Sequence, residues 1–185
     1  MAAGAADAVP AEAELVRAFV NTLDVDDGSD ALPDAAALTR WLRGQGLLGS
    51  RATADEDDLR VALLLRSGLR AALAAHHAGD PDAPIAELEQ VSALLPLRVA
   101  FVGATPTLVP ADAGARAGLE RVLAAVMACE AAGTWSRLKL CPADDCQWAF
   151  YDASKSRTRV WCAMGVCGNR TKTRAYRARH RAGAS

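Results

Sequence analysis

Four cysteines near the C-terminal end form two pairs with the same internal spacing. Four residues separate the members of each pair and fifteen separate the two pairs, which are Cys141 with Cys146 and Cys162 with Cys167. Such pairs can bring four thiolates to one tetrahedral point, and zinc is the usual metal of an all-sulfur site in an intracellular protein. Because sulfur would take all four positions, none is left for a reacting water. The spacing predicts one structural Zn2+; a four-cysteine iron–sulfur cluster is the alternative.

A basic stretch follows the last cysteine, which we expect to open a helix. Arg170, Arg174, Arg177 and Arg181 are four, three and four residues apart, so they share one side of this helix. The helix has almost no apolar side, and we expect it to project from the body. A metal-stapled module that ends in a basic helix typically meets nucleic acid; a solvated tail is the alternative. The predicted nucleic-acid contacts are Lys155, Arg157, Arg159, Asn169, Arg170, Lys172, Arg174, Arg177 and Arg181.

The charges of the chain are segregated although its net charge is only -1 over 185 residues. Residues 1–133 carry 10 Lys and Arg against 19 Asp and Glu, whereas residues 134–185 carry 11 against 3. An acidic body joined to a basic end indicates that only the end faces a polyanion. We therefore predict a sensing or dimerising domain at residues 10–133 and a DNA-binding module at residues 134–185.

The elements that must carry these residues are mostly helices. Periodic apolar residues predict helices over 11–22, 33–43, 84–95 and 112–132, and a longer one that starts from a capping box of Thr53 and Glu56 and ends near Gly79. Alternating apolar residues over 97–102 and 107–109 flank a Gly/Pro turn and predict a β-hairpin. Residues 147–152 read as a strand of the cysteine module. The predicted fold class is mainly α with a small β-hairpin: a helical N-terminal domain plus a small zinc-stabilised α+β module.

No catalytic motif is recognisable in the body, and we expect a protein that is not an enzyme. Two polar residues in apolar surroundings have alternative interpretations. Arg66 lies between Leu63 and Leu69, where it would either pair with an Asp at the core edge or anchor an anionic ligand. Asn21 would either cap the first helix or line a ligand pocket. The fifth cysteine, Cys129, reads as a buried and unreactive thiol.

The sequence favours a location in the cytoplasm, without contact to a membrane. The start of the chain lacks the positive region and long apolar run of a signal peptide. No apolar stretch reaches the ~20 residues that a membrane span needs. In the cytosol, paired cysteines more often bind metal than form disulfides.

Residues from about 140 to 181 resemble the CGNR zinc finger, a bacterial family named for the tetrapeptide that begins at Cys167. The resemblance rests on both cysteine pairs, the aromatic strand that ends at Asp152, the Arg-rich loop, and Trp161 before Cys162. Ala163 departs from the serine expected there. Residues 10–133 more loosely resemble the ABATE domain, which usually precedes this finger, through 19–24 and the segment that holds Arg66 and Arg70. The resemblance implies a stress-related transcription regulator.

The leading hypothesis is therefore a regulator that binds DNA through the zinc module. Its N-terminal domain would sense a small-molecule effector or form a homodimer. An RNA- or ribosome-associated module and a protein–protein adaptor are the alternatives, because basic zinc modules serve all three purposes.

Overall fold

The computed structural model describes residues 8–80 and 82–182, without the side chains of residues 175 and 178–182. The segment on which the signal-peptide expectation depends lies outside these residues. The N-terminal part contains the helices α1 (Ala11–Val20), α2 (Ala35–Gly44), α3 (Glu56–Ala78), α4 (Ala86–Ser92) and α5 (Gly114–Ala131). The C-terminal part contains the 3-10 turn η1 (Trp135–Arg137), the strands β5 (Leu138–Leu140) and β6 (Ala149–Tyr151), the π-helical turn η2 (Met164–Gly168) and the helix α6 (Asn169–Ala182).

The strands form small two-stranded antiparallel sheets. β1 (Leu23–Asp24) pairs with β2 (Ser29–Asp30), β3 (Leu97–Val102) with β4 (Thr105–Pro110), and β5 with β6. The mainly helical fold class and the hairpin are confirmed, and the turn of the hairpin is shorter than predicted because Thr105 and Pro106 already belong to β4. The pair β1–β2 was not predicted.

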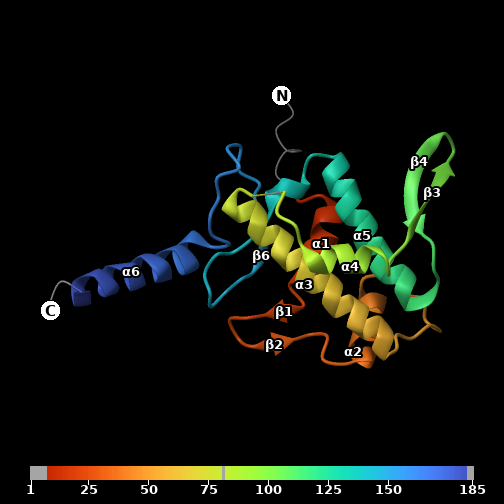
Figure 1. Cartoon of the computed structure of the whole chain (residues 1–185), viewed down its shortest axis with the longest axis horizontal. Helices are drawn as coiled ribbons and strands as arrows, with labels where there is room; N and C mark the ends of the chain where they lie inside the picture. The colour runs from red at the N-terminus through yellow and green to blue at the C-terminus, as the bar shows by residue number, and fades with distance from the viewer. Residues whose placement is uncertain (1–7, 81, 183–185) are drawn as a thin grey trace.

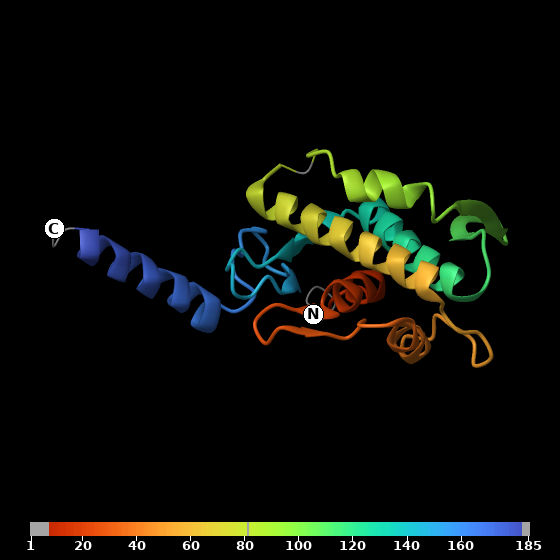
Figure 2. The same ribbon diagram turned by 60° about the horizontal axis from the view of Figure 1, so that its bottom comes forward.

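Helix α3 runs through the middle of the molecule, with α1, α4, α5 and β5 packed around it (Figure 1, Figure 2). Its Leu65, Leu69 and Leu73 are completely buried, as is Phe19 of α1. The same core continues into the C-terminal part through Leu138, Leu140 and Ala149. The first strands of the cysteine module are therefore anchored in the core of the helical domain.

The start of α3 corrects one local prediction. The helix begins at Glu56, so its N-cap is Asp55, which accepts a hydrogen bond from the Asp58 backbone N–H while Asp58 reaches back to Asp55. Thr53 lies two residues before the cap, too early for its hydroxyl to bond the N–H groups of the first turn. The capping box of Thr53 and Glu56 is therefore wrong, and the helix begins two residues later than that box predicts.

Gly68 of α3 lies in close contact with Leu88 of α4. A Cβ atom at Gly68 would stand 2.7 Å from Cδ2 and 3.1 Å from the backbone nitrogen of Leu88. Alanine gains roughly 0.5–1 kcal/mol over glycine within a helix, but overpacking costs about 1–3 kcal/mol. Because backbone cannot yield as a side chain can, we expect Gly68→Ala to lower the free energy of unfolding by about 1–2 kcal/mol in urea denaturation.

The matched control for this prediction is Gly49→Ala. A Cβ atom there meets nothing within 4 Å, and Gly49 does not have a positive φ. We expect a change within about 0.5 kcal/mol. Equal effects of the two substitutions would contradict the close α3–α4 contact.

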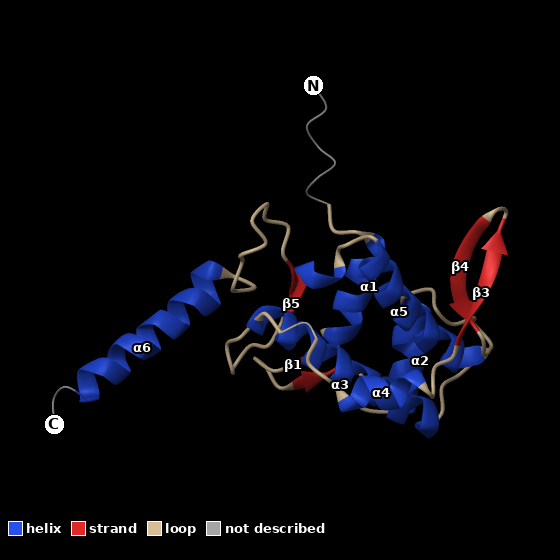
Figure 3. Ribbon diagram, turned by 45° about the horizontal axis from the view of Figure 1, so that its top comes forward, coloured by secondary structure: helices blue, strands red, loops and turns tan. Residues whose placement is uncertain are grey.

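Two segments project from the body at opposite ends. Helix α6 extends at one end and the β3–β4 hairpin at the other (Figure 1, Figure 3). No helix in the described part of the chain is long and apolar enough to span a membrane.

Candidate metal centre and nucleic-acid interface

The first cysteine pair sits on a tight turn directly after β5. Cys141 donates its backbone N–H to the carbonyl of Trp148 at 3.0 Å, and Cys146 donates to the carbonyl of Ala143 at 2.9 Å. Gln147 then takes a φ of 50°, which reverses the chain into β6. These bonds turn both thiols toward the same point.

The second pair is held by the π-helical turn η2. Cys162 precedes this turn, and Cys167 lies inside it with its N–H bonded to the carbonyl of Ala163 at 2.9 Å. The helical path thus starts at Met164 and continues directly into α6. Cys167 does not open the basic helix as predicted, but it is joined rigidly to it.

The four sulfur atoms form one compact cluster. All lie within 4.8 Å of one another. The sulfur of Cys162 is 3.6 Å from that of Cys146 and 3.5 Å from that of Cys167. These distances are too long for a disulfide and match the ~3.8 Å edge of a tetrahedron whose zinc–sulfur bonds measure ~2.3 Å. Within the described residues, no other group of three or more Cys, His, Asp or Glu side chains is arranged to hold a metal.

In the absence of a cation, burial opposes ionisation of two of these thiols. Burial raises the pKa of Cys146 to about 11 and also raises the pKa of Cys162. At Cys167 burial acts in the same direction, but hydrogen bonds from Cys162, the other thiols and Arg170 lower its pKa overall. A divalent metal would supply the positive charge that keeps all four sulfurs ionised.

A buried ion pair between Asp152 and Lys139 stabilises the cysteine module. Asp152 is completely buried, directly after β6, and it accepts hydrogen bonds from Lys139 Nζ at 2.8 Å and from the backbone N–H of Arg159 at 2.9 Å. The Lys139 ammonium also donates to the carbonyl of Arg157 at 2.6 Å. Together these contacts fasten the basic loop to the β5–β6 sheet. The function of Lys139 was not predicted, because a single lysine in a three-residue strand carries no recognisable pattern.

The predicted basic residues of the loop fall into two groups. Lys155 and Arg157 have exposed side chains. The guanidinium of Arg159 instead bonds the carbonyls of Trp161 and Cys162 and lies 5.1 Å from the centre of the Phe150 ring. Arg159 therefore fixes the backbone at Trp161 and Cys162, where the second cysteine pair begins.

The start of the basic helix is paired with acidic residues of the protein itself. Arg170 contacts Asp26 of the β1–β2 loop at 3.0 Å and Asp145 at 2.9 Å, and Arg174 contacts Asp145 at 2.7 Å. Arg170 also bonds the sulfur of Cys167 at 3.9 Å. The neighbouring guanidinium of Arg174 lowers the pKa of Asp145. These contacts tie the first turn of α6 to the cysteine cluster and to the N-terminal domain, and neither acid was predicted.

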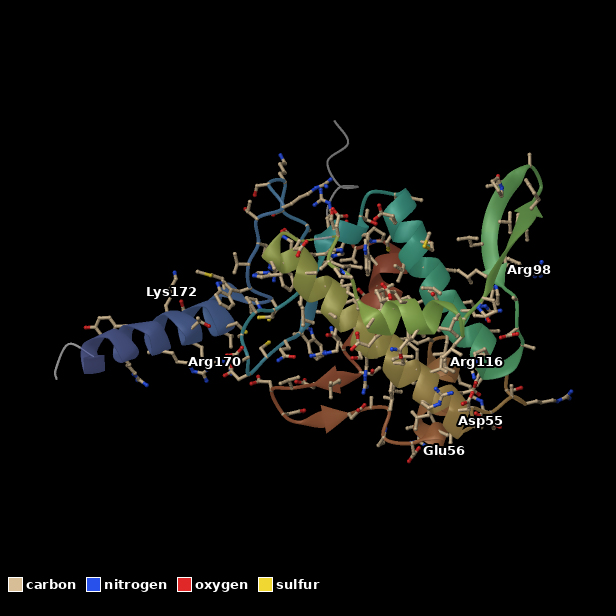
Figure 4. The ribbon with its side chains drawn as sticks, viewed as in Figure 1. Asp55, Glu56, Arg98, Arg116, Arg170 and Lys172 are labelled. Carbon is tan, nitrogen blue, oxygen red and sulfur yellow. The ribbon has the colours of Figure 1, made fainter. Side chains whose placement is uncertain are left out.

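The other predicted residues of α6 are less engaged. Lys172 and Arg177 are exposed and form no ion pair with a described residue, and Lys172 lies on the opposite side of α6 from Arg170 (Figure 4). Asn169 donates to the carbonyl of Gly165 at 3.1 Å. The side chain of Arg181 lies outside the described part. The structure thus leaves Lys155, Arg157, Lys172 and Arg177 exposed and without an ion pair to a described residue, while Arg159 and Arg174 are exposed but already bonded within the protein.

The two candidate ligand residues of the body make contacts within the protein. Both terminal nitrogens of Arg66 bond Asp30, each at 2.7 Å, so the pairing with an acid at the core edge is what the structure shows. Asn21 caps α1 with its backbone, and its side-chain amide exchanges two hydrogen bonds with the backbone of Ala149. Asn21 thereby joins α1 to β6. A ligand at either residue stays a prediction without structural support.

Comparison with protein families gives two matches. A model described as "Putative stress-induced transcription regulator", ABATE, matches residues 13–137, and a model described as "CGNR zinc finger" matches residues 137–180. No curated protein matches the chain. The zinc-finger match and the four clustered sulfurs agree, and the protein has one structural zinc site formed by Cys141, Cys146, Cys162 and Cys167.

Proposed function

The chain belongs to the ABATE family and ends in a CGNR zinc finger, and from this premise we propose that it is a transcription regulator that binds DNA through α6 and the loop before it. Neither matched family is described as an enzyme. The observation that carries the proposal is the position of α6: the zinc cluster holds its first turn, and the rest of the helix projects with exposed cationic side chains (Figure 4).

The basic residues at the start of α6 form ion pairs within the protein, and those further along are exposed, which supports this proposal. Arg170 and Arg174 are paired at the anchored end, while Lys172, Arg177 and the loop residues Lys155 and Arg157 stay available. Cations on a helix and an adjacent loop are the usual means by which small modules neutralise phosphates and set their orientation on a duplex. We propose that these four residues contact the DNA backbone first.

The N-terminal domain would influence this binding through direct contacts. Asp26 pairs with Arg170, Asn21 pairs with the backbone of Ala149, and Arg70 donates to the side chain of Gln147 at 3.0 Å. A change in the helical domain would therefore reach the base of α6 without a flexible linker between them. We propose that regulation follows this route and that residues 10–133 act as the controlling domain and residues 134–185 as the DNA-binding module.

The salt dependence of binding tests the proposal. We expect the zinc-loaded protein to bind duplex DNA with an affinity that falls with salt, at a log–log slope of about -5 if six phosphates are neutralised. Replacing Lys172 and Arg177 together by alanine should weaken binding to all sequences and make the slope shallower by about 2. Fluorescence anisotropy from low to physiological salt measures both quantities.

The matched control carries Arg40→Ala and Arg51→Ala, which change the net charge equally at exposed sites of the N-terminal domain. We expect this variant to keep the slope of the wild type. Equal losses in both double variants would contradict an interface on α6. Strong salt-dependent binding to structured RNA with none to duplex DNA would favour the RNA-associated alternative.

A further inference from the structure

The projecting β3–β4 hairpin exposes large apolar side chains. Val99, Phe101 and Val102 are 62%, 70% and 71% exposed, more than any other large apolar residue described. The strands hold a single charged residue, Arg98, near the base of the hairpin (Figure 4). A lone two-stranded hairpin in water is marginally stable at best.

One face of the hairpin is apolar throughout. Side chains alternate between the faces of a strand, so Leu97, Val99 and Phe101 share a face. The register sets them opposite Pro110, Leu108 and Pro106 of β4. The opposite face contains Arg98 and two threonines. β4 packs against α5 at the base of the hairpin, and within the described chain neither strand pairs with a strand outside the hairpin.

The two edges of the hairpin differ in their ability to pair. A two-residue turn at 103–104 joins Val102 to Thr105, and Gly103 has the positive φ of 63° that such turns require. The residues that flank this turn are hydrogen-bonded to each other, and the pattern alternates along the strands. The N–H groups of Leu97, Val99 and Phe101 therefore point outward from β3, and none of them bonds another described residue.

The β4 edge is blocked by prolines. Pro106 and Pro110 occupy outward-facing positions of this strand, where they offer no N–H group. Prolines at such positions are a common protection against unwanted pairing of an edge strand. Protection of one edge and not the other indicates that β3 is the edge intended for a partner.

From this asymmetry we propose that β3 pairs with β3 of a second copy of the chain, antiparallel, around a two-fold axis at Val99. Each copy would add its outward N–H and C=O groups to a four-stranded sheet. Leu97 would lie opposite Phe101 of the second copy, and Arg98 opposite Ala100, so no like charges would face each other. The strand is self-complementary, as an interface between identical subunits requires.

The exposed tip would be covered in this arrangement. Antiparallel pairing centred on Val99 carries the tip of each hairpin to the base of the other. Leu94, which is 37% exposed, lies there three residues before β3. Phe101 and Val102 would therefore meet apolar surface of the second copy instead of water, which favours association.

A charge swap at Val99 tests the pairing. We expect zinc-loaded wild-type protein to sediment near 39 kDa, twice its 19.3 kDa. Val99→Lys and Val99→Glu each place like charges on the axis and should raise the dissociation constant of the dimer about tenfold or more. Mixing the two variants should restore a mixed dimer, since Lys and Glu then face each other. Analytical ultracentrifugation without DNA measures these states, so the result is independent of the proposed DNA binding.

Val160→Lys is the matched control, because it makes the same change at an exposed valine outside the hairpin, in the cysteine module. We expect this variant to dimerise like the wild type, and circular dichroism should show all variants folded. A wild-type protein that stays monomeric at about 100 µM would overturn the proposal. So would a dimer that Val99→Lys leaves intact, or variants that do not combine when mixed.

Discussion

Chelation of zinc should unfold the cysteine module while the helical domain stays folded. Structural zinc contributes about 10–16 kcal/mol of apparent binding energy in small modules, more than a few buried aromatic residues can replace. The separate small core of this module contains mainly the cysteines, Ala143 and Phe150. Leu138, Leu140 and Ala149 belong to the main core, so β5 and β6 should keep part of their protection. Hydrogen exchange across residues 138–170, before and after chelation, measures which of these residues lose protection and which keep it.

Cys162→Ser should reproduce the effect of chelation, since it removes one of the four ligands. The matched control is Cys129→Ser, the same substitution at a buried cysteine outside the cluster. We expect the control to keep one zinc per chain by metal analysis, and the Cys162 variant to lose tight zinc binding and DNA binding together. A Cys162 variant with wild-type zinc affinity would contradict the four-sulfur site.

Among residues that stabilise the module without binding zinc, Asp152 is the one whose substitution by Asn should lower the free energy of unfolding most. The substitution removes the negative charge that faces the Lys139 ammonium at 2.8 Å, at a site with no exposure to water. Breaking a buried pair from one side costs about 3–5 kcal/mol, because the remaining charge is left without compensation. We expect a loss of this size in the free energy of unfolding of the zinc-loaded protein, measured by urea denaturation.

The matched control, Asp144→Asn, removes an exposed carboxylate from the same module and should change stability by less than about 0.5 kcal/mol. The pH dependence offers a second check. Burial opposes ionisation of Asp152, but the bonds from Lys139 and Ser154 outweigh it and lower its pKa to about 2. A depressed pKa gives stability that is complete above the ordinary value of 3.8 and is lost toward pH 2. The gap between wild type and Asp152→Asn should therefore be constant from about pH 5 to 8.

The sequence predicts the metal site well because its ligands are close in the chain. Two short cysteine pairs need only local turns to converge, and the structure brings all four sulfurs together. The helices are equally local, since each one carries its own periodicity and end signals. The hairpin is visible for the same reason. The local predictions that fail do so by small shifts. The N-cap of α3, for example, is the carboxylate of Asp55, two residues after the predicted Thr53.

Contacts between distant residues leave no such signal. Arg170 and Asp26 are 144 residues apart, and Arg66 and Asp30 are 36 apart, so neither pairing is visible in the spacing of charges. The arginines of α6 do lie on a helix as predicted, but Arg170 and Arg174 form ion pairs with acidic residues of the protein itself. The change of net charge near residue 133 predicts a domain boundary there. The hydrophobic core of the N-terminal domain nevertheless continues past this point to Ala149. The strands β1 and β2 have two residues each, too few to show an alternation.

The opposite placement of α6 and the β3–β4 hairpin bears on the layout of the DNA target. A dimer joined through its hairpins would carry its two basic helices at the far ends of an elongated particle. Compact dimeric regulators place both reading elements about one helical turn of DNA apart. Here we expect protection of two well-separated tracts with unprotected DNA between them, or the bridging of two different DNA segments into a loop.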